Sequence, residues 1–355
     1  ANHFVNLLAA LGKENFFRGY YFFNNGTKQA VLSLLLKATR PLKEDTAERL
    51  RELLQKTDIK DTRLVEAAVY APQWANLAEE VTGWKGLKKA VWFFHAHINE
   101  RFSAEKETEV AVYSPITPTQ FNDGAFDKNW FWDAYETLGE KRFNQLYKAA
   151  KYITDGSNRH RRSQLYADAV RGKLNAEELK EEIIAKRNQE KLRAYPLIPL
   201  GDKGTAEALK RYEFIQKFLK ESRQFGSARR ESEKKAVNTA LENLAITMGY
   251  SDVNRMIWFM EGRKLEELKP LMEPFTVGEV SLRLEISDLG DPGIAVEKNG
   301  KPQKTIPAAI KKEPRVAELK NAAAQLKDQK SRARKTLENA MADGESFPGD
   351  ELRKF

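Results

Sequence analysis

The sequence predicts a mainly α-helical protein: an irregular helical bundle or an α-solenoid, with a small antiparallel β-meander and a long heptad-patterned C-terminal helix. Three observations support this prediction. Apolar residues recur at helical spacing in short segments that Gly and Pro interrupt. Apolar and polar residues alternate from Val280 to Ile286. After Pro314, apolar residues are spaced alternately three and four apart, which is a heptad seam.

The first half of the chain reads as short helices joined by polar turns. We expect helices over 28–40, 45–57, 62–71, 72–83, 86–102, 127–139 and 141–156. In the first of these, Val31, Leu34 and Leu35 share a face that we expect to be buried, and Asp45 is the expected cap of the second. Residues 108–126 read as a looser connection with a short extended piece. No fixed period of 33–47 residues assigns a named repeat class.

Aromatic residues are concentrated in three runs: NFFRGYYFF (15–23), VWFF (91–94) and WFWDAY (130–135). As a helix, residues 15–24 would be apolar over most of their circumference, as a helix buried on several sides is. We therefore expect core positions. A partner-docking surface is an alternative, and a membrane or base-stacking surface is a weaker one because Arg18 alone gives no basic polar face.

The second half begins after YPLIPLGDKG (195–204), whose two prolines and two glycines mark an expected domain boundary. Before it, residues 176–194 read as one surface helix, and after it come helices over 205–226 and 228–249 and a third helix capped by Ser251. The expected domains are a solenoid-like helical region over 1–200, a helical region over 201–275, the β-meander over 276–312 and the long helix over 313–345.

The meander and the long helix have the clearest signals. We expect three strands, with Asn299-Gly300 as the hairpin turn between two of them. The long helix should pack along a neighbouring helix of this chain or of a second chain. Its seam consists of Val316, Leu319, Ala323, Leu326, Ala333, Leu337 and Ala340, with Lys330 in the one missing slot.

Composition excludes several classes of function. The chain has no cysteine, which excludes disulfides, thiolate catalysis, iron–sulfur clusters and cysteine zinc sites. This fits a reducing compartment without establishing one. No apolar run reaches the roughly 18–20 residues of a membrane span, and the first residues lack the pattern of a signal peptide. Because the chain also lacks an initiator Met, we expect a piece of a longer, cytoplasmic protein.

Motifs for catalysis and cofactor binding are absent from the sequence. It contains no phosphate-binding loop, dinucleotide-binding glycine motif, nucleophile elbow or zinc-protease motif. His95, His97 and Glu100 superficially resemble a metal-ligand set, but on a helix the two histidine rings diverge. Adjacent carboxylates such as Glu181-Glu182 read as solvated faces. We therefore expect no cofactor, metal or catalytic residue, although an unrecognised active site remains an alternative.

The basic charge is localised. Residues 151–240 hold 21 Lys/Arg and 13 Asp/Glu, a difference of +8 within a net charge of +9. Such a localised excess points to a partner. The expected partner-binding residues are Arg159, Arg161, Arg162, Arg223, Arg229 and Arg230. They fit an acidic protein partner or, as the alternative, nucleic acid bound through residues 157–235; an ordinary solvated turn fits them too.

Three passages resemble a known family: KENFFRGYYFFNNGTKQAVLS (13–33), NTALENLAITMGYSDVNRMIWFMEG (238–262) and VEKNGKPQKTIPAAIKKEPRVAELK (296–320). They are similar to large bacterial proteins of unknown function labelled molybdate-metabolism-regulator-like, or MolR-like. The resemblance implies an internal, largely helical piece of a longer protein that works beside MoxR-type AAA+ ATPases. It supplies no catalytic residues and no molybdate pocket.

Together these features predict a non-catalytic protein-interaction or scaffolding module. The expected partner is an acidic protein surface or an AAA+ ATPase, met by the turn from Arg223 to Arg230. We expect no membrane partner, and the sequence leaves the oligomeric state open.

Overall fold

The computed structural model describes residues 1–18, 26–154, 158–250 and 252–344. These residues form seventeen α-helices, several short 3-10 turns and four strands, which confirms the mainly α-helical class with a small β-meander. The chain divides into two compact units, which we call unit 1 (Ala1–Gly249) and unit 2 (Tyr250–Phe355).

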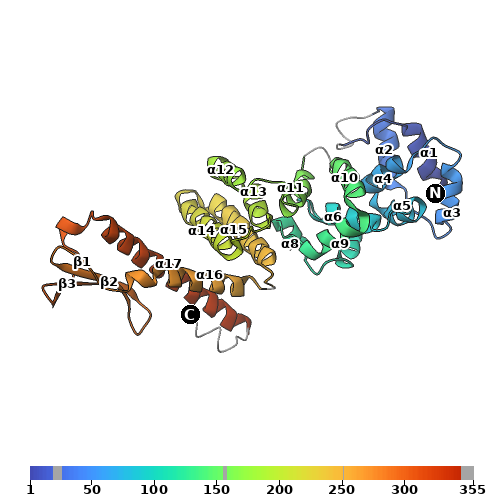
Figure 1. The fold of residues 1–355 in the computed structure, drawn as a ribbon. Coiled ribbons are helices and arrows are strands. Elements are labelled where there is room, and N and C mark those ends of the chain that lie inside the picture. Colours follow the sequence, from blue (N-terminus) through green and yellow to red (C-terminus); the bar gives the residue numbers. More distant parts are fainter. Residues whose placement is uncertain (19–25, 155–157, 251, 345–355) are drawn as a thin grey trace. The chain divides into compact units, whose positions relative to one another are not determined.

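Unit 1 begins with short helices that pack on neighbours close in the sequence, from α1 toward α9 (Figure 1). The first five are α1 (Asn2–Leu11), α2 (Lys28–Ala38), α3 (Ala47–Leu54), α4 (Asp61–Tyr70) and α5 (Ala75–Thr82). Two expectations about them are wrong. The buried face of α2 is Ala30, Ser33 and Leu36, because the Ser33 hydroxyl accepts the backbone N–H of Phe17 at 3.0 Å. The cap of α3 is Thr46, since Asp45 instead binds the amino group of Ala1.

The next five helices are α6 (Leu87–Ala96), α7 (Ala104–Ala111), α8 (Pro118–Asp123), α9 (Lys128–Leu138) and α10 (Glu140–Ala149). The predicted loose connection over 108–126 is therefore largely helical. Its helix starts are capped by Ser103, whose hydroxyl accepts the Lys106 N–H, and by Thr117, which forms a capping box with Gln120. Side-chain capping stabilises helices too short to persist on propensity alone.

The aromatic runs at 91–94 and 130–135 lie mostly in the core of unit 1. Trp92, Phe93, Phe94, Trp130 and Phe131 are all buried, which confirms the core expectation for them. Phe93 meets Phe94, Phe126, Trp130 and Phe131 edge-to-face, the arrangement that aromatic quadrupoles prefer.

The first aromatic run behaves differently. Residues 15–18 lie in no helix, so that part of the helix expected over 15–24 is wrong, and residues 19–25 lie outside the described residues. Phe16 is buried all the same. Its ring stacks on Tyr70 at 4.8 Å between centroids and meets Tyr152 edge-on.

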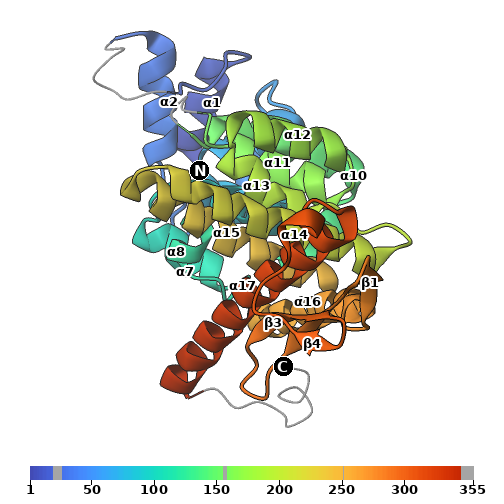
Figure 2. The same ribbon diagram turned by 90° about the vertical axis from the view of Figure 1, so that its left-hand side faces the viewer.

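Unit 1 ends with α11 (Arg161–Val170), α12 (Ala176–Lys186), α13 (Gln189–Ala194), α14 (Gly204–Glu221) and α15 (Ser227–Met248). The single helix expected over 176–194 is two helices. Arg187 takes a left-handed conformation with φ 47°, and the Asn188 side chain caps α13 by accepting the Lys191 N–H. Helices α14 and α15 pack against each other (Figures 1 and 2).

Residues 195–204, expected as a domain boundary, lie within unit 1. The wholly buried guanidinium of Arg211 donates to the carbonyl oxygens of Ile198 and Pro199. The Asn243 side chain donates to the carbonyl of Arg193 at 2.9 Å. Prolines and glycines break the helix here, but these hydrogen bonds fix the break to α14 and α15. The division between units accordingly follows Gly249 instead.

Unit 2 opens with α16 (Val253–Leu268), whose N-cap is Asp252 where Ser251 was expected; Ser251 itself lies outside the described residues. An antiparallel sheet follows in the order β1 (Phe275–Val277), β2 (Val280–Ile286), β3 (Pro292–Lys298) and β4 (Lys301–Pro302). The meander thus has four strands among the described residues where we expected three. Asn299 and Gly300 both have positive φ, which confirms the predicted tight hairpin turn.

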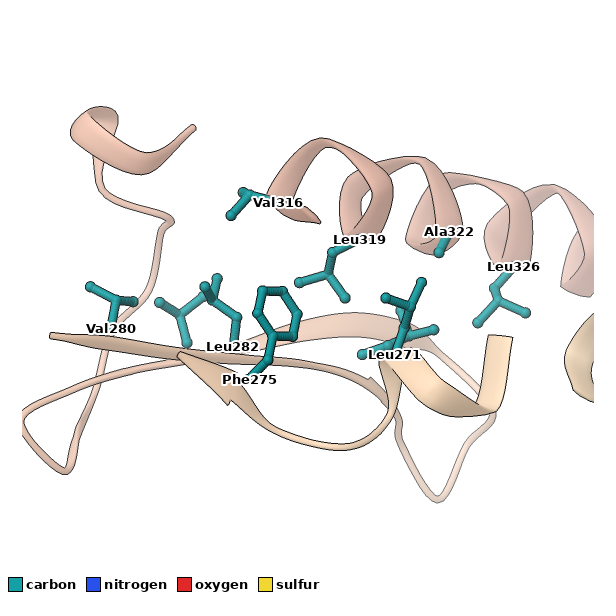
Figure 3. Close-up of a cluster of buried hydrophobic side chains, with 10 residues drawn as sticks. Leu271, Phe275, Val280, Leu282, Val316, Leu319, Ala322 and Leu326 are labelled. Carbon is teal, nitrogen blue, oxygen red and sulfur yellow. The ribbon is translucent and has the colours of Figure 1, made fainter. Parts of the chain in front are cut away.

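The last described helix, α17 (Pro314–Asp343), confirms the long helix after Pro314. Its first half lies on the sheet: Val316, Leu319, Ala322 and Leu326 point toward Leu271, Phe275, Val280 and Leu282 (Figure 3). Farther along, Arg332 binds Glu261 of α16 at 2.7 Å. The seam therefore packs on the sheet over its first half, and α17 contacts α16 farther along. The side chain of Ala340 lies outside the described set.

Candidate protein-interaction surface

The predicted arginines at the start of α11 differ in exposure. Arg159 and Arg161 are exposed, whereas Arg162 is buried. The Arg162 guanidinium forms two parallel hydrogen bonds with the Glu190 carboxylate, at 2.5 and 2.6 Å, and donates to the carbonyl of Asn122 at 2.7 Å. Its donors therefore hold α11, α8 and α13 together. Arg162 stabilises the fold and does not belong to the exposed basic surface we predicted.

Arg162 also lines a polar hollow of about 610 Å³. Three cations, Arg162, Arg193 and Lys235, line it together with three anions, Asp123, Glu190 and Glu231. Because these charges balance, the hollow does not favour an acidic ligand over a basic one.

The other three predicted arginines come together at one turn. We call residues 222–230 the tip: they comprise a 3-10 turn (Ser222–Gln224), Phe225, Gly226 and the start of α15. Arg223, Arg229 and Arg230 are exposed there. The Arg229 guanidinium lies 3.8 Å from the centre of the Phe225 ring, a cation–π contact that holds the ring in place.

A buried carboxylate fixes the tip to the preceding helices. Glu233 of α15 is 0% exposed and accepts two hydrogen bonds from Arg187, at 3.0 and 2.7 Å, and a third from Arg229 at 3.0 Å. Arg187 also donates to Glu221 and to the carbonyl of Phe218. One residue at the end of α12 thereby ties together α14, the tip and α15.

The electrostatics of this cluster follow from its hydrogen bonds. Burial pushes the pKa of Glu233 up, but the hydrogen bonds from Arg187 and Arg229 outweigh burial and hold that pKa below its ordinary value. The same Glu233 contact raises the pKa of Arg187. Glu233 is therefore charged at neutral pH, and the cluster is a fixed ionic lock.

Arg230 is unlike its neighbours. It has no ion-pair partner among the residues that the structure describes, and it lies in the first turn of α15. A cation there opposes the helix dipole, whose positive end is at the N-terminus. Lys234, four residues later, pairs with Glu231 at 3.8 Å. The dipole therefore makes Arg230 unfavourable for the stability of α15.

The model of a family of unknown function, DUF5724, matches residues 1–260, most of the chain. The chain belongs to the DUF5724 family. A second model, of a domain of unknown function named DUF4132, matches residues 300–355. No curated protein and no solved structure matches the chain.

The DUF5724 region contains a second basic feature that sequence reasoning missed. A hollow of about 380 Å³ lies between α12 and α14. Lys180 and Ile184 line it from α12 and Arg187 from the residue after α12, and Lys210, Phe214 and Lys217 are among the residues that line it from α14. In both segments a cation, an apolar residue and a cation stand at positions i, i+4 and i+7 of the sequence, although Arg187 lies beyond the last helical turn. That repeated spacing is the signal in the sequence that would have found them.

In this DUF5724 chain, the ring nitrogens of His95 and His97 form hydrogen bonds with the backbone. His95 lies near the end of α6 and its Nε2 donates to the carbonyl of Val69, while His97 contacts Phe93 and Asp127. Among the described ranges, no three His, Asp or Glu side chains are placed to hold a metal ion. Nor does any described helix have the length and apolarity needed to cross a lipid bilayer.

Proposed function

We propose that the chain is a non-catalytic protein-interaction or scaffolding module that binds an acidic protein surface through the tip. The observation that carries this proposal is Arg230. Its charge opposes the dipole of α15, and it forms no ion pair among the described residues that would offset this. A residue that breaks a local rule without a compensating contact in the fold marks a site selected for something else.

The rest of the tip supports binding by presenting the cations rigidly. The Arg187–Glu233–Arg229 lock fixes the start of α15, and Phe225 is held against Arg229. A surface that is ordered before binding loses less conformational entropy when a partner arrives. Exposed arginines also form paired hydrogen bonds with carboxylates, which gives them geometric specificity for an acidic partner.

The resemblance to MolR-like proteins makes a MoxR-type AAA+ ATPase the first partner that we propose to test. It also makes the bacterial cytoplasm the proposed setting.

The test compares the wild-type chain with Arg230→Glu and with the double variant Arg223→Glu/Arg230→Glu in capture of proteins from a nuclease-treated bacterial lysate. The control is Lys43→Glu/Lys141→Glu, which reverses two exposed lysines elsewhere in unit 1. We expect the wild type and the control to recover the same protein and the double variant to lose it. Arg230→Gln, which removes the cation without placing an anion three residues before Glu233, should raise the free energy of unfolding by about 0.3–1 kcal/mol, because no charge then opposes the dipole.

Three outcomes contradict the proposal. Recovery of the same proteins by the double variant would show that the tip binds none of them. Capture of proteins from an untreated lysate but not from the nuclease-treated one would assign the basic segment to nucleic acid. Recovery of no protein at all would remove the scaffolding role.

A further inference from the structure

The hollow between α12 and α14 is open at its centre and charged at its margins. Ile184 is 61% exposed, although it is a large aliphatic side chain. Phe214 is half-buried: one side of its ring meets Tyr195 edge-on at 5.5 Å, and it also lines the hollow. Phe218 is buried beneath them. The floor is thus apolar and fixed in position by packing from below.

Three lysines and two carboxylates surround this floor. Lys180, Lys210 and Lys217 line the hollow with Glu213 and Glu221, whereas Arg187, which also lines it, is already bound to Glu221 and Glu233. Lys180 pairs with Glu177 at 3.3 Å and Lys217 with Glu221 at 3.9 Å, both on the surface, where such pairs contribute little and are readily exchanged. Lys210 has no ion-pair partner among the residues that the structure describes. The lysines are therefore available to carboxylates of another molecule.

We propose that this hollow binds a short amphipathic helix of a protein partner, with an apolar side chain inserted between Ile184 and Phe214. Glu or Asp residues three to four positions on either side of that side chain would pair with Lys210 and Lys217 on one margin and Lys180 on the other. This spacing matches the i, i+4, i+7 pattern of the two lining segments, as in other helix-in-groove complexes. The inference rests on the proposed function and names the partner's recognition element.

The chemistry favours a peptide over nucleic acid. Nucleic-acid phosphates could meet the lysines but would leave the exposed Ile184 without an apolar contact. An acidic amphipathic helix satisfies both parts of the hollow. Its apolar residue covers Ile184, and its carboxylates meet the lysines.

The experiment measures binding of a fluorescent helical peptide of about 15 residues, capped at both ends, to the full chain by fluorescence anisotropy. The peptide has leucines along one face and glutamates flanking them, and a shuffled peptide of the same composition breaks that face. We expect the amphipathic peptide to bind and the shuffled one to bind roughly tenfold more weakly or worse, because burial of apolar surface requires the leucines together.

Matched variants locate the site. Lys210→Glu/Lys217→Glu should weaken binding by roughly tenfold or more, whereas Lys43→Glu/Lys141→Glu, with the same change in net charge, should change it by less than about twofold. Ile184→Ser should weaken binding by roughly tenfold, while Val112→Ser, at a 73% exposed apolar residue outside the hollow, should leave it unchanged. All four substituted lysines are exposed, and circular dichroism confirms that each variant is folded.

Equal binding of the shuffled peptide, or equal weakening by the two lysine pairs, would overturn the inference, because either result indicates unspecific attraction of charge. So would displacement of the peptide by an oligothymidylate of about 20 nucleotides, which would make the hollow a nucleic-acid surface. If no peptide binds but partner capture still depends on the tip, the inference about the hollow is wrong and the proposed function stands. If the peptide binds while capture is unaffected by the tip variants, the proposed role of the tip is wrong and the inference about the hollow stands.

Discussion

His97 is the residue whose surroundings are most fully determined. Its Nδ1 lies 2.8 Å from the carbonyl oxygen of Phe93, and its Nε2 lies 3.2 Å from the backbone nitrogen of Asp127. A carbonyl only accepts and a backbone N–H only donates, so the proton is on Nδ1 and Nε2 is the acceptor. Burial lowers the pKa of His97 to about 4 and that of His95 to about 3. Both rings are neutral in the folded protein.

These histidines predict that the protein loses stability in mild acid. In the unfolded chain they take up protons near pH 6.5, so neutrality stabilises the folded state fully above that pH, and this stabilisation is lost as the pH falls toward 4. At about pH 5 we expect each histidine to lower the free energy of unfolding by roughly 2 kcal/mol relative to pH 8. Urea titrations at a series of pH values measure this.

One variant serves as the comparison for the pH series. His97→Gln removes one titrating ring and should flatten the slope between pH 6.5 and about 5 relative to the wild type. A wild-type free energy of unfolding that does not change over this range would show that the buried rings are not the neutral groups described here.

Residue-level roles were the least predictable from sequence. In the sequence, Arg162 and Arg229 each stand beside other arginines, as in an exposed basic cluster. In the fold, Arg162 is enclosed by Glu190 and α8, and Arg229 binds Glu233. Glu190 and Glu233 lie 28 and 4 positions away along the chain. Charge counting locates the excess of cations in the sequence, but only the fold shows which of these cations are exposed. Arg187 was missed because nothing local marks a left-handed arginine.

At the level of elements, α17 shows that a sequence pattern can predict a helix without predicting which element it packs against. The heptad spacing correctly indicates that one stripe is buried, but a flat apolar sheet accepts that stripe as well as another helix does. Lys330, the slot that breaks the seam, donates to the carbonyl of Leu289 and the carboxylate of Asp291 in the β2–β3 turn. The polar interruption therefore marks the point where the helix passes that turn.

The packing of α17 on the sheet predicts a large effect of a single truncation. Leu319→Ala removes a side chain that is 0% exposed and should lower the free energy of unfolding of unit 2 by about 2–5 kcal/mol. Leu289→Ala makes the same chemical change at a residue that is 83% exposed and should cost less than about 0.5 kcal/mol. Hydrogen exchange of the full chain, followed in β2 and α17, measures both.

If Leu289→Ala and Leu319→Ala accelerate hydrogen exchange in β2 equally, the sheet is not held by the buried stripe of α17.

Elements whose existence depends on side-chain caps were the hardest to predict. Helices α7 and α8 have too few apolar residues for a periodic signal, and Ser103 and Thr117 define them instead. Long periodic segments such as α14, α15 and α17 were predicted nearly to their ends.

At the scale of the whole molecule, the family matches and the structural units divide the chain differently. The DUF4132 match begins at residue 300, within the hairpin turn. Six of the ten residues in the core cluster of unit 2 precede that position: Leu271, Phe275, Val280, Leu282, Leu284 and Val296. The buried stripe of α17 therefore folds against a sheet that lies almost wholly outside its own family match.

This division predicts how fragments behave. A fragment of residues 250–355 should fold and unfold cooperatively in urea, because it contains both the sheet and α17, and its one tryptophan, Trp258, reports the transition. A fragment of residues 300–355 lacks the apolar surface that α17 covers, so its circular dichroism should decline gradually with urea and show no sigmoidal transition. A sharp transition in the shorter fragment would mean that α17 is stable without the sheet.

The sheet of unit 2 has one further consequence, for self-association. Its two outer strands are β1, with three residues, and β4, with two, and Pro302 in β4 has no backbone N–H. Because these strands are so short, β2 from Arg283 to Ile286 and β3 from Pro292 to Ala295 pair only with each other among the described residues and have no strand on their outer sides. Strand exchange or amyloid-like growth through this sheet is therefore confined to two free edges of four residues each, one of which begins with a proline that has no backbone N–H.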